Sequence, residues 1–522
     1  MSLSTEAIAP LLIVGAGPTG LSLAITCRRF GLPVRIIDRA PESSRFSKAL
    51  AIWSGSLEAF SAMGVADSFI AEGRRLHSVK IGDGRRELGS ISVGEGIDSP
   101  YPFAILLPQS RTEQLLARHL ESLGGAIERG VELIGIRQDS QAAIATLRHS
   151  DGREGTVRAR YVAGCDGARS VMRQSLEIAF EGFTEEQTFL LCDARVEGEL
   201  DLASIYIWWH NGGSIGLFPI HNDIWRVITI RTGSKSEEPP TLEEIQRCLD
   251  LHGPGGLRLR GASWLSVFRI NERLAARFRS GRCFIVGDAA HVHSPAGGQG
   301  MNTGIQDGVN LGWKLAYVLA GVEDPEVLLE SYEAERRPVA RYVIKGATQG
   351  LHIGFGAGAV IRAARDLAVP ILTRIPAVRR MLQTQLSETD ITYDDGPLVK
   401  LASSGKPKGR AGVGRRARDV SIHDAAGGAS GNLWPLLCGP CHTLLLFGAD
   451  EPSRELIAAA GDRLRTVRID ESSDPNGQVH ARYEIDAPGW ILIRPDQVIA
   501  ARGPSADTAV LERYIRRVIL RP

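Results

Sequence analysis

The chain has 522 residues, which is enough for two to four domains with substantial cores. Its 61 basic and 60 acidic residues leave a net charge of +1, so nothing in the charge indicates a nucleic-acid or membrane-surface partner. Seven cysteines, an odd number spread along the chain, are typical of the reducing cytoplasm and not of a disulfide framework. The apolar run at 8–14 is short and lacks a basic flank, and no window approaches about eighteen apolar residues, so we expect neither a signal peptide nor a membrane-spanning helix.

The N-terminal segment predicts a βαβ dinucleotide-binding unit. Residues 11–14 predict a strand, Gly15-Ala16-Gly17-Pro18-Thr19-Gly20 gives the pattern G-x-G-x-x-G, and residues 21–30 predict a helix. A second strand at 34–37 leads to Asp38, whose carboxylate stands at the usual distance to bind a ribose hydroxyl. Because that carboxylate would repel a 2′-phosphate, the site should hold FAD or NAD and not NADP.

Between this unit and the middle of the chain, short β-rich segments predict a second sheet. Three strands are expected to leave the first unit and return to it, at residues 77–81, 87–92 and 103–107. Three more predict an antiparallel meander, at residues 204–210, 214–219 and 225–231. Alternation places Tyr206, Trp208 and His210 on one face of the first meander strand and Ile205, Ile207 and Trp209 on the other.

Two further strands end in polar, glycine-containing loops. The strand at 160–165 leads into Asp166-Gly167, and the strand at 283–286 leads into the loop 287–302, in which four of sixteen residues are glycine. Glycine lets backbone N–H groups approach a flat or anionic ligand, and the helix predicted at 303–319 points its positive end at this loop. Asp288 can accept a hydrogen bond from a ligand hydroxyl. The loop 287–302 is therefore predicted to bind a cofactor.

The same loop and helix carry two other patterns. Glycines recur at four-residue spacing, at Gly300, Gly304, Gly308 and Gly312. Because each glycine inside a helix costs about 1 kcal/mol relative to alanine, we expect this bare stripe to pack closely against another backbone. His291 and His293 have H-x-H spacing, but no third ligand cluster lies nearby, so loop packing or cofactor proximity is favoured over a metal.

The C-terminal third predicts a helical region and then a separate domain. Residues 349–395 are rich in arginine and apolar residues, which favours a helical cover or a subunit contact over a membrane surface. The last domain is predicted to hold strands at 443–447, 464–469 and 490–493 and helices at 455–460 and 508–518. Cys438-Gly439-Pro440-Cys441 spells the thioredoxin redox motif, but it precedes a strand instead of following one, so we interpret it as a coincidental turn.

Together, these motifs resemble the class A flavoprotein aromatic hydroxylases. The resemblance rests on the N-terminal glycine pattern, Cys165-Asp166-Gly167 and Gly287-Asp288-Ala289-Ala290-His291, and it continues through residues 295–302, 310–315 and 332–338. It is closest to the phenol hydroxylase, pentachlorophenol monooxygenase and polyketide hydroxylase branch. It implies an α/β fold with a Rossmann-type FAD-binding domain, a β-sheet substrate domain and a C-terminal thioredoxin-like domain.

The resemblance also implies domain boundaries. The FAD-binding domain would cover residues 1–185, interrupted by substrate-domain strands at about 76–108, and would resume at 271–395 with the helical region. The substrate-binding sheet would cover 186–270, a linker 396–412, and the thioredoxin-like domain 413–522.

Residue by residue, the resemblance implies a set of FAD contacts at the three loops and near them. They are Gly15, Gly17, Pro18, Thr19, Gly20, Asp38, Arg39, Arg45, Lys48, Gln109, Arg111, Asp166, Gly287, Asp288, Pro295, Gly298, Gly300, Met301 and Asn302. A basic residue shortly after the acid at 38 reaches the cofactor in the family, and both Arg45 and Lys48 are open for this role. Arg173 is a candidate for the nicotinamide co-substrate, NADPH or NADH.

The implied reaction is hydroxylation of a phenolic or polycyclic aromatic compound. NAD(P)H would reduce FAD, dioxygen would add to give a flavin C4a-hydroperoxide, and its distal oxygen would pass to an electron-rich ring. Candidate substrate contacts are Tyr206, Trp208, His210, Phe218 and Trp53, although aromatic residues in a sheet are as often simple packing. No residue matches a catalytic base, so the substrate's own acidity would serve.

Alternatives remain open at this point. A Baeyer–Villiger or other oxidative tailoring flavoprotein would share these motifs, and so would a flavoprotein that binds an aromatic ligand without turnover. The expected partners are a small aromatic substrate, NAD(P)H and dioxygen, and the resemblance also allows a homodimer.

Overall fold

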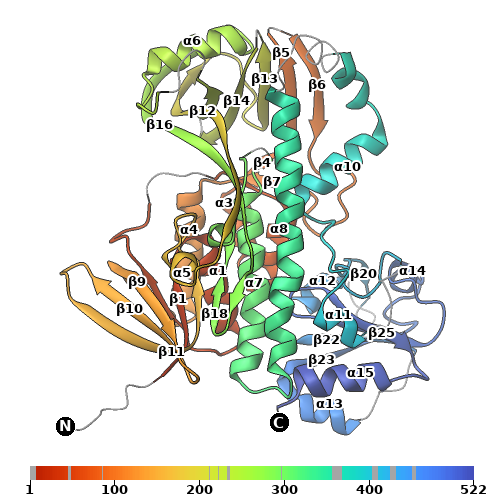
Figure 1. Ribbon diagram of the computed structural model, residues 1–522. Helices are drawn as coiled ribbons and strands as arrows, with labels where there is room; N and C mark the ends of the chain where they lie inside the picture. Colours follow the sequence, from red (N-terminus) through yellow and green to blue (C-terminus); the bar gives the residue numbers. More distant parts are fainter. Residues whose placement is uncertain are drawn as a thin grey trace.

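The computed structural model describes residues 8–44, 49–84, 86–210, 212–221, 223–231, 236–295, 297–355, 367–402, 409–423, 431–448 and 454–521. Figure 1 shows a sheet-and-helix region at the lower left, a second sheet above it and a C-terminal domain at the lower right. The long helix α8 (Pro325–Phe355) runs beside the first region and contacts the second sheet. The predicted mixed α/β architecture is confirmed. None of the helices described here is both long and apolar enough to cross a bilayer.

The first sheet contains the predicted dinucleotide-binding unit. Its strands are β1 (Ala9–Val14), β2 (Arg35–Asp38), β8 (Ile127–Arg129), β9 (Val131–Gln138), β10 (Ala143–His149), β11 (Glu154–Gly164), β17 (Arg279–Ser280) and β18 (Cys283–Ile285). Strand β1 pairs in parallel with β2 and β11, and β11 pairs in parallel with β18. The register joins Val14 to Gly164 and Gly164 to Ile285, so the three predicted strand-to-loop junctions lie side by side.

Helices cover this sheet, and two of them approach each other closely. The helices are α1 (Pro18–Arg29), α2 (Ser54–Met63), α3 (Ala66–Glu72), α4 (Gln109–Ser122), α5 (Val171–Ser175) and α7 (Gly300–Leu319). A Cβ added to Gly304, Gly308 or Gly312 of α7 would stand only 2.5–2.7 Å from atoms of α1. Close packing against α1 is confirmed for these three glycines, but only Gly308 meets backbone first, at the carbonyl oxygen of Thr19, whereas Gly304 and Gly312 meet the side chains of Thr19 and Thr26. Gly300 differs, because its nearest neighbour would be His293, at 3.6 Å.

The second sheet combines the predicted meander with strands from both sides of it. Its order is β19-β16-β12-β15-β14-β13-β5-β6. The strands are β5 (Ser78–Asp83), β6 (Arg86–Ser92), β12 (Phe180–Glu197), β13 (Ser204–His210), β14 (Gly213–His221), β15 (Ile224–Ile230), β16 (Arg258–Ala275) and β19 (His291–Val292). Antiparallel pairing of β13, β14 and β15 confirms the meander. Helix α6 (Leu242–His252) packs against it.

The predicted strand at 103–107 has a different place. It forms β7 (Ala104–Leu106), which pairs with β3 (Ala51–Ile52) and β4 (Arg74–Leu76) in a sheet of its own. This small sheet lies between the two large sheets in Figure 1 and contributes Leu106 and Ala51 to the site described below.

The C-terminal domain has the strand order β23-β22-β24-β25, with the first pair parallel and the others antiparallel. Its strands are β20 (Ser421–Ile422), β21 (Gly431–Asn432), β22 (His442–Phe447), β23 (Leu464–Ile469), β24 (Gly489–Ile493) and β25 (Ile499–Pro504). Its helices are α12 (Trp434–Leu437), α13 (Arg454–Ala460), α14 (Gln478–Arg482) and α15 (Ala509–Tyr514). A β-α-β unit followed by a hairpin and a helix is the thioredoxin-like arrangement.

Two expectations for this end of the chain can be compared with the structure. Cys438 and Cys441 are free thiols just before β22, and burial raises the pKa of Cys438 to about 11, whereas a redox-active thiol needs a lowered pKa. The predicted linker is not simply extended, because α11 (Pro397–Ala402) lies within it and buries four apolar side chains. In the predicted helical region, α10 (Pro376–Ser387) is present, and residues 356–366 lie outside the described residues.

Candidate active site

The N-terminal glycine loop is shaped by its own backbone. Gly15 has φ +103°, and a Cβ there would stand 2.3 Å from the carbonyl oxygen of Cys165. A Cβ on Gly20 would stand 1.9 Å from the carbonyl oxygen of Gly15, which no backbone tolerates. Gly17 is different, because a Cβ there meets no protein atom within 4 Å. Gly15 and Gly20 therefore let the loop form, whereas Gly17 leaves room for a ligand, as a dinucleotide diphosphate requires.

Asp38 closes this loop from the end of β2. Its Oδ2 accepts a hydrogen bond from the backbone N–H of Ala16 at 2.7 Å, and its Oδ1 accepts one from Ala40 at 2.8 Å. Each carboxylate oxygen can accept a further hydrogen bond. The arrangement fits a carboxylate that also binds a ribose hydroxyl.

A cavity of about 690 Å³ extends from this loop to the second sheet. It is lined by many of the residues predicted from sequence to contact cofactor or substrate. These are Gly17, Pro18, Thr19, Trp53, Gln109, Phe218, Asp288, Pro295, Gly298, Gly300 and Met301. Residues distant in sequence thus share one space, because the parallel strands place their loops at the same sheet edge.

Asp166 and Asn302 lie at this wall without being among its lining residues. Burial raises the pKa of Asp166, whose Oδ2 accepts a hydrogen bond from Met172 N–H while its buried Oδ1 has no partner among the described residues. The Asn302 amide accepts from Trp53 N–H at 2.9 Å and donates to the carbonyls of Ala51 and Gly298. The Asn302 side chain therefore fixes the loop, and only its backbone N–H is left for the role predicted from sequence.

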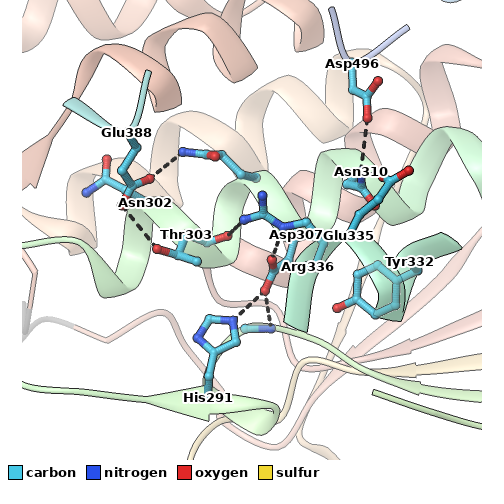
Figure 2. Close-up of polar contacts among 12 residues, drawn as sticks. His291, Asn302, Thr303, Asp307, Asn310, Tyr332, Glu335, Arg336, Glu388 and Asp496 are labelled. Atoms are coloured by element: carbon cyan, nitrogen blue, oxygen red, sulfur yellow. Dashed lines mark hydrogen bonds and ion pairs between the residues drawn. The ribbon is translucent and has the colours of Figure 1, made fainter. Parts of the chain in front are cut away.

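A buried ionic cluster on α7 and α8 holds the loop that carries His291 (Figure 2). Asp307 on α7 accepts hydrogen bonds from His291 Nε2 at 2.7 Å, from the backbone N–H of Gly287 at 3.2 Å and from Arg336 at 2.6 Å. Burial would raise the pKa of Asp307, but the charges of Arg336 and His291 outweigh it, and the pKa is lowered. Asp307 thus holds the loop next to Asp288 in place. His291 is engaged with this carboxylate, so the H-x-H pair serves loop packing at its first position.

Helix α10 covers the opposite end of the cavity. Leu386 lines the cavity, and the carbonyl of Gln385 accepts a hydrogen bond from Gln299 at 2.8 Å. Glu388, directly after the end of α10, is buried against α7, where Thr303 donates to one carboxyl oxygen at 3.1 Å and Gln306 donates to the other (Figure 2). Burial raises the pKa of Glu388 to about 8.

We expect Glu388 to make stability fall as pH rises. The folded protein holds the Glu388 proton up to about pH 8, whereas an unfolded chain releases it near 4.5. The contribution is therefore fully present below about pH 4.5 and is lost as pH rises through 8. In melting experiments, Glu388→Gln should gain stability relative to the natural chain between pH 5.5 and pH 8.5, by roughly 1 kcal/mol or more. A pH-independent difference between the two proteins would contradict this assignment.

The face of β13 that was predicted to contact the substrate is not the face that lines the cavity. Ile205 and Ile207 line the cavity, together with Phe218, whereas Tyr206 and Trp208 pack into a separate core with Trp225 beneath α6. His210 is paired with Asp83 at 2.8 Å and does not line the cavity. Alternation defines two faces, but only the position of α6 decides which one is covered. The structure therefore does not bring Tyr206, Trp208 and His210 to the cavity, contrary to the prediction that they contact the substrate.

Three predicted arginines do not line the cavity. Arg111 is paired with Glu72 on the exposed side of α4, and Arg39 is exposed outside the cavity. The Arg173 guanidinium is buried, donates to the carbonyls of Ala289 and Ala168 at 2.8 Å, and stacks on Phe180. It braces the loop and is not open to a nicotinamide. The two remaining basic candidates, Arg45 and Lys48, lie outside the described residues.

Sequence reasoning missed Arg226 and its partner. Arg226 is 2 % exposed, lines the cavity from β15, and makes a two-point ion pair with Asp193 at 2.9 and 2.8 Å. Alternation along β15 could have indicated this position, because Arg226 lies on the same strand face as Ile228, which also lines the cavity. A charged residue on an otherwise apolar face indicates a binding role.

Comparison with known proteins agrees with this site. Residues 9–347 match the family model described as "FAD binding domain", and residues 410–522 match "Aromatic-ring hydroxylase, C-terminal". The chain is 34% identical to 6-methylpretetramide 4-monooxygenase of Streptomyces rimosus over 98% of this chain and 94% of the relative.

Solved structures of aromatic hydroxylases also resemble this chain over nearly its full length. The anhydrotetracycline hydroxylase OxyS of Streptomyces rimosus superposes with a TM-score of 0.80 and 29% identity over 98% of this chain and 99% of that one. Aklavinone-11 hydroxylase, solved with FAD and aklavinone, gives a TM-score of 0.78 at 26% identity over 99% and 100% of the two chains. The glycine loops, the shared cavity and these matches together place this chain in the family of FAD-dependent aromatic hydroxylases, which are flavoprotein monooxygenases.

Proposed function

We propose that this monooxygenase hydroxylates a polycyclic phenol or enol in its ionised form, with the oxyanion held near Arg226. The composition of the cavity wall carries the proposal. Its sheet side is apolar, with Ile205, Ile207, Phe218 and Ile228, and Arg226 stands among them. An apolar wall that holds one guanidinium, here paired with Asp193, suits a flat aromatic ligand with an anionic oxygen. The compared proteins named for 6-methylpretetramide, anhydrotetracycline and aklavinone support a substrate of this kind.

When bound, FAD would supply the redox chemistry for a hydroxylation that consumes NAD(P)H and dioxygen and releases the second oxygen atom as water. The residues of this chain bind and orient. Gly17 leaves space for the diphosphate, Asp38 and Asp288 accept hydroxyl hydrogen bonds, and the N-terminus of α7 stabilises negative charge at Met301. The apolar wall excludes water from the reacting groups, and Arg226 favours the phenolate, which is the more electron-rich form of the ring.

Three expectations about the surroundings of the enzyme belong to this proposal. NADPH or NADH is the electron donor, the enzyme acts in the cytoplasm, and it forms a homodimer. The seven free cysteines are consistent with a reducing compartment.

Labelled dioxygen tests the function directly. With FAD and either nicotinamide, polycyclic phenols should stimulate NAD(P)H oxidation and take up a single ¹⁸O atom, whereas their O-methyl ethers should do neither. Methyl ethers that react as well as the phenols would contradict an ionised substrate. A ring-expanded lactone as product would instead establish Baeyer–Villiger chemistry.

Arg226→Met should raise the KM for a phenolic substrate by roughly 10- to 150-fold, because hydrogen bonds to charged groups contribute about 1.5–3 kcal/mol. Its FAD content should not change, since Arg226 stands in the sheet wall. The variant also leaves Asp193 without its arginine, so the double variant Arg226→Met/Asp193→Leu is the matched control for stability. Equal KM values for the natural chain and both variants would show that Arg226 only serves the fold.

A further inference from the structure

His293 is the second histidine of the H-x-H pair, and it lines the cavity together with Asp288 and Gly300. Its Nδ1 lies 2.7 Å from the carbonyl oxygen of Ser294. A carbonyl oxygen only accepts hydrogen bonds, so Nδ1 carries the proton and donates it. The other ring nitrogen, Nε2, is buried and has no hydrogen-bond partner among the described residues.

The charge state of the ring follows from its surroundings. Burial lowers the pKa of His293 to about 4, so the imidazole is neutral at pH 7. A neutral ring protonated at Nδ1 presents a bare lone pair at Nε2, which can only accept. Leaving such a group unsatisfied and buried costs about 1–3 kcal/mol. A buried polar atom without a partner among the described residues needs a donor from elsewhere, and a ligand in the cavity can supply one.

The position of Nε2 indicates which ligand supplies that donor. Nε2 is within 3.6 Å of where a Cβ on Gly300 would stand, and Gly300 begins α7. His293 belongs to the loop that also carries Asp288 and Pro295, whereas the apolar sheet residues and Arg226 form the other wall. We infer that His293 Nε2 accepts a hydrogen bond from a hydroxyl or N–H group of bound FAD. The inference rests on the proposed use of this cavity for FAD.

The FAD dissociation constant of the protein tests this inference without turnover. His293→Phe keeps an aromatic ring but removes the acceptor, and it should weaken FAD binding about tenfold, as expected for one lost hydrogen bond. His293→Gln can present its side-chain oxygen near the Nε2 position, and it should bind FAD within about threefold of the natural chain. Rescue by glutamine separates a hydrogen-bonding role from a role in packing.

His442→Phe is the matched control. His442 is also fully buried, and its Nε2 also lacks a partner, but it packs against Trp313 and Tyr317 of α7, away from the cavity. Its replacement should leave FAD affinity unchanged. Binding by His293→Phe within twofold of the natural chain, or glutamine and phenylalanine variants that are equally weak, would overturn the inference. Failure of the natural chain to bind FAD would instead overturn the proposed function.

Discussion

Asp307→Ala is expected to lower the free energy of unfolding by about 3–5 kcal/mol, the usual result of removing one partner of a buried ion pair. Asp307 and Arg336 are almost fully inaccessible to solvent, with exposed side-chain fractions of 0 % and 1 %. Without the carboxylate, the Arg336 guanidinium would stay buried, and its hydrogen-bond partners among the described residues would be the Tyr393 hydroxyl and the Thr303 carbonyl. Urea unfolding of the two proteins measures the difference.

The same substitution should also weaken FAD binding, because the carboxylate anchors Gly287 and His291 next to Asp288. Glu326→Ala is the control: its ion pair with Arg279 is largely exposed on the glutamate side, at 58 %, so its loss should cost about 1 kcal/mol or less. If Asp307→Ala were no more destabilising than this control, the cluster would not be what holds the loop.

Gly20→Ala is expected to cost about 3 kcal/mol, the upper end for overpacking, and to weaken FAD binding roughly 150-fold. The added Cβ would meet the carbonyl oxygen of Gly15 at 1.9 Å, so the whole glycine loop must move. Both the melting temperature without FAD and the FAD dissociation constant should therefore change.

Gly17→Ala should separate these two effects. Its φ of −76° suits alanine, and its Cβ meets no protein atom, so the melting temperature without FAD should stay the same. The methyl group would occupy space that the ligand needs, so FAD binding should still weaken. Gly135→Ala, a strand position with equally open surroundings and no ligand nearby, should change neither quantity. Normal FAD binding by Gly17→Ala would show that the diphosphate does not approach this glycine.

The sequence was most informative where local pattern and chemistry coincide. The G-x-G-x-x-G loop, Asp38 and the glycine stripe on α7 could be assigned in advance, because each demands a particular residue type at a particular backbone position. The meander could be predicted from alternation and turns. It was least informative for side chains whose role depends on a neighbour from another element, such as Arg173, which proved to brace two backbone carbonyls.

By itself, then, the sequence determined the order of the strands and loops and the family of aromatic hydroxylases. It also indicated that the three glycine-containing loops bind a nucleotide. Only the tertiary structure decided which face of β13 looks onto the cavity, that Arg226 stands there beside Asp193, and that Asp307 is shared by His291 and Arg336. The physical reason is that periodicity records the alternation of side chains along one element. Which side becomes buried depends on what packs against it, and for β13 that was α6, which follows only later in the chain.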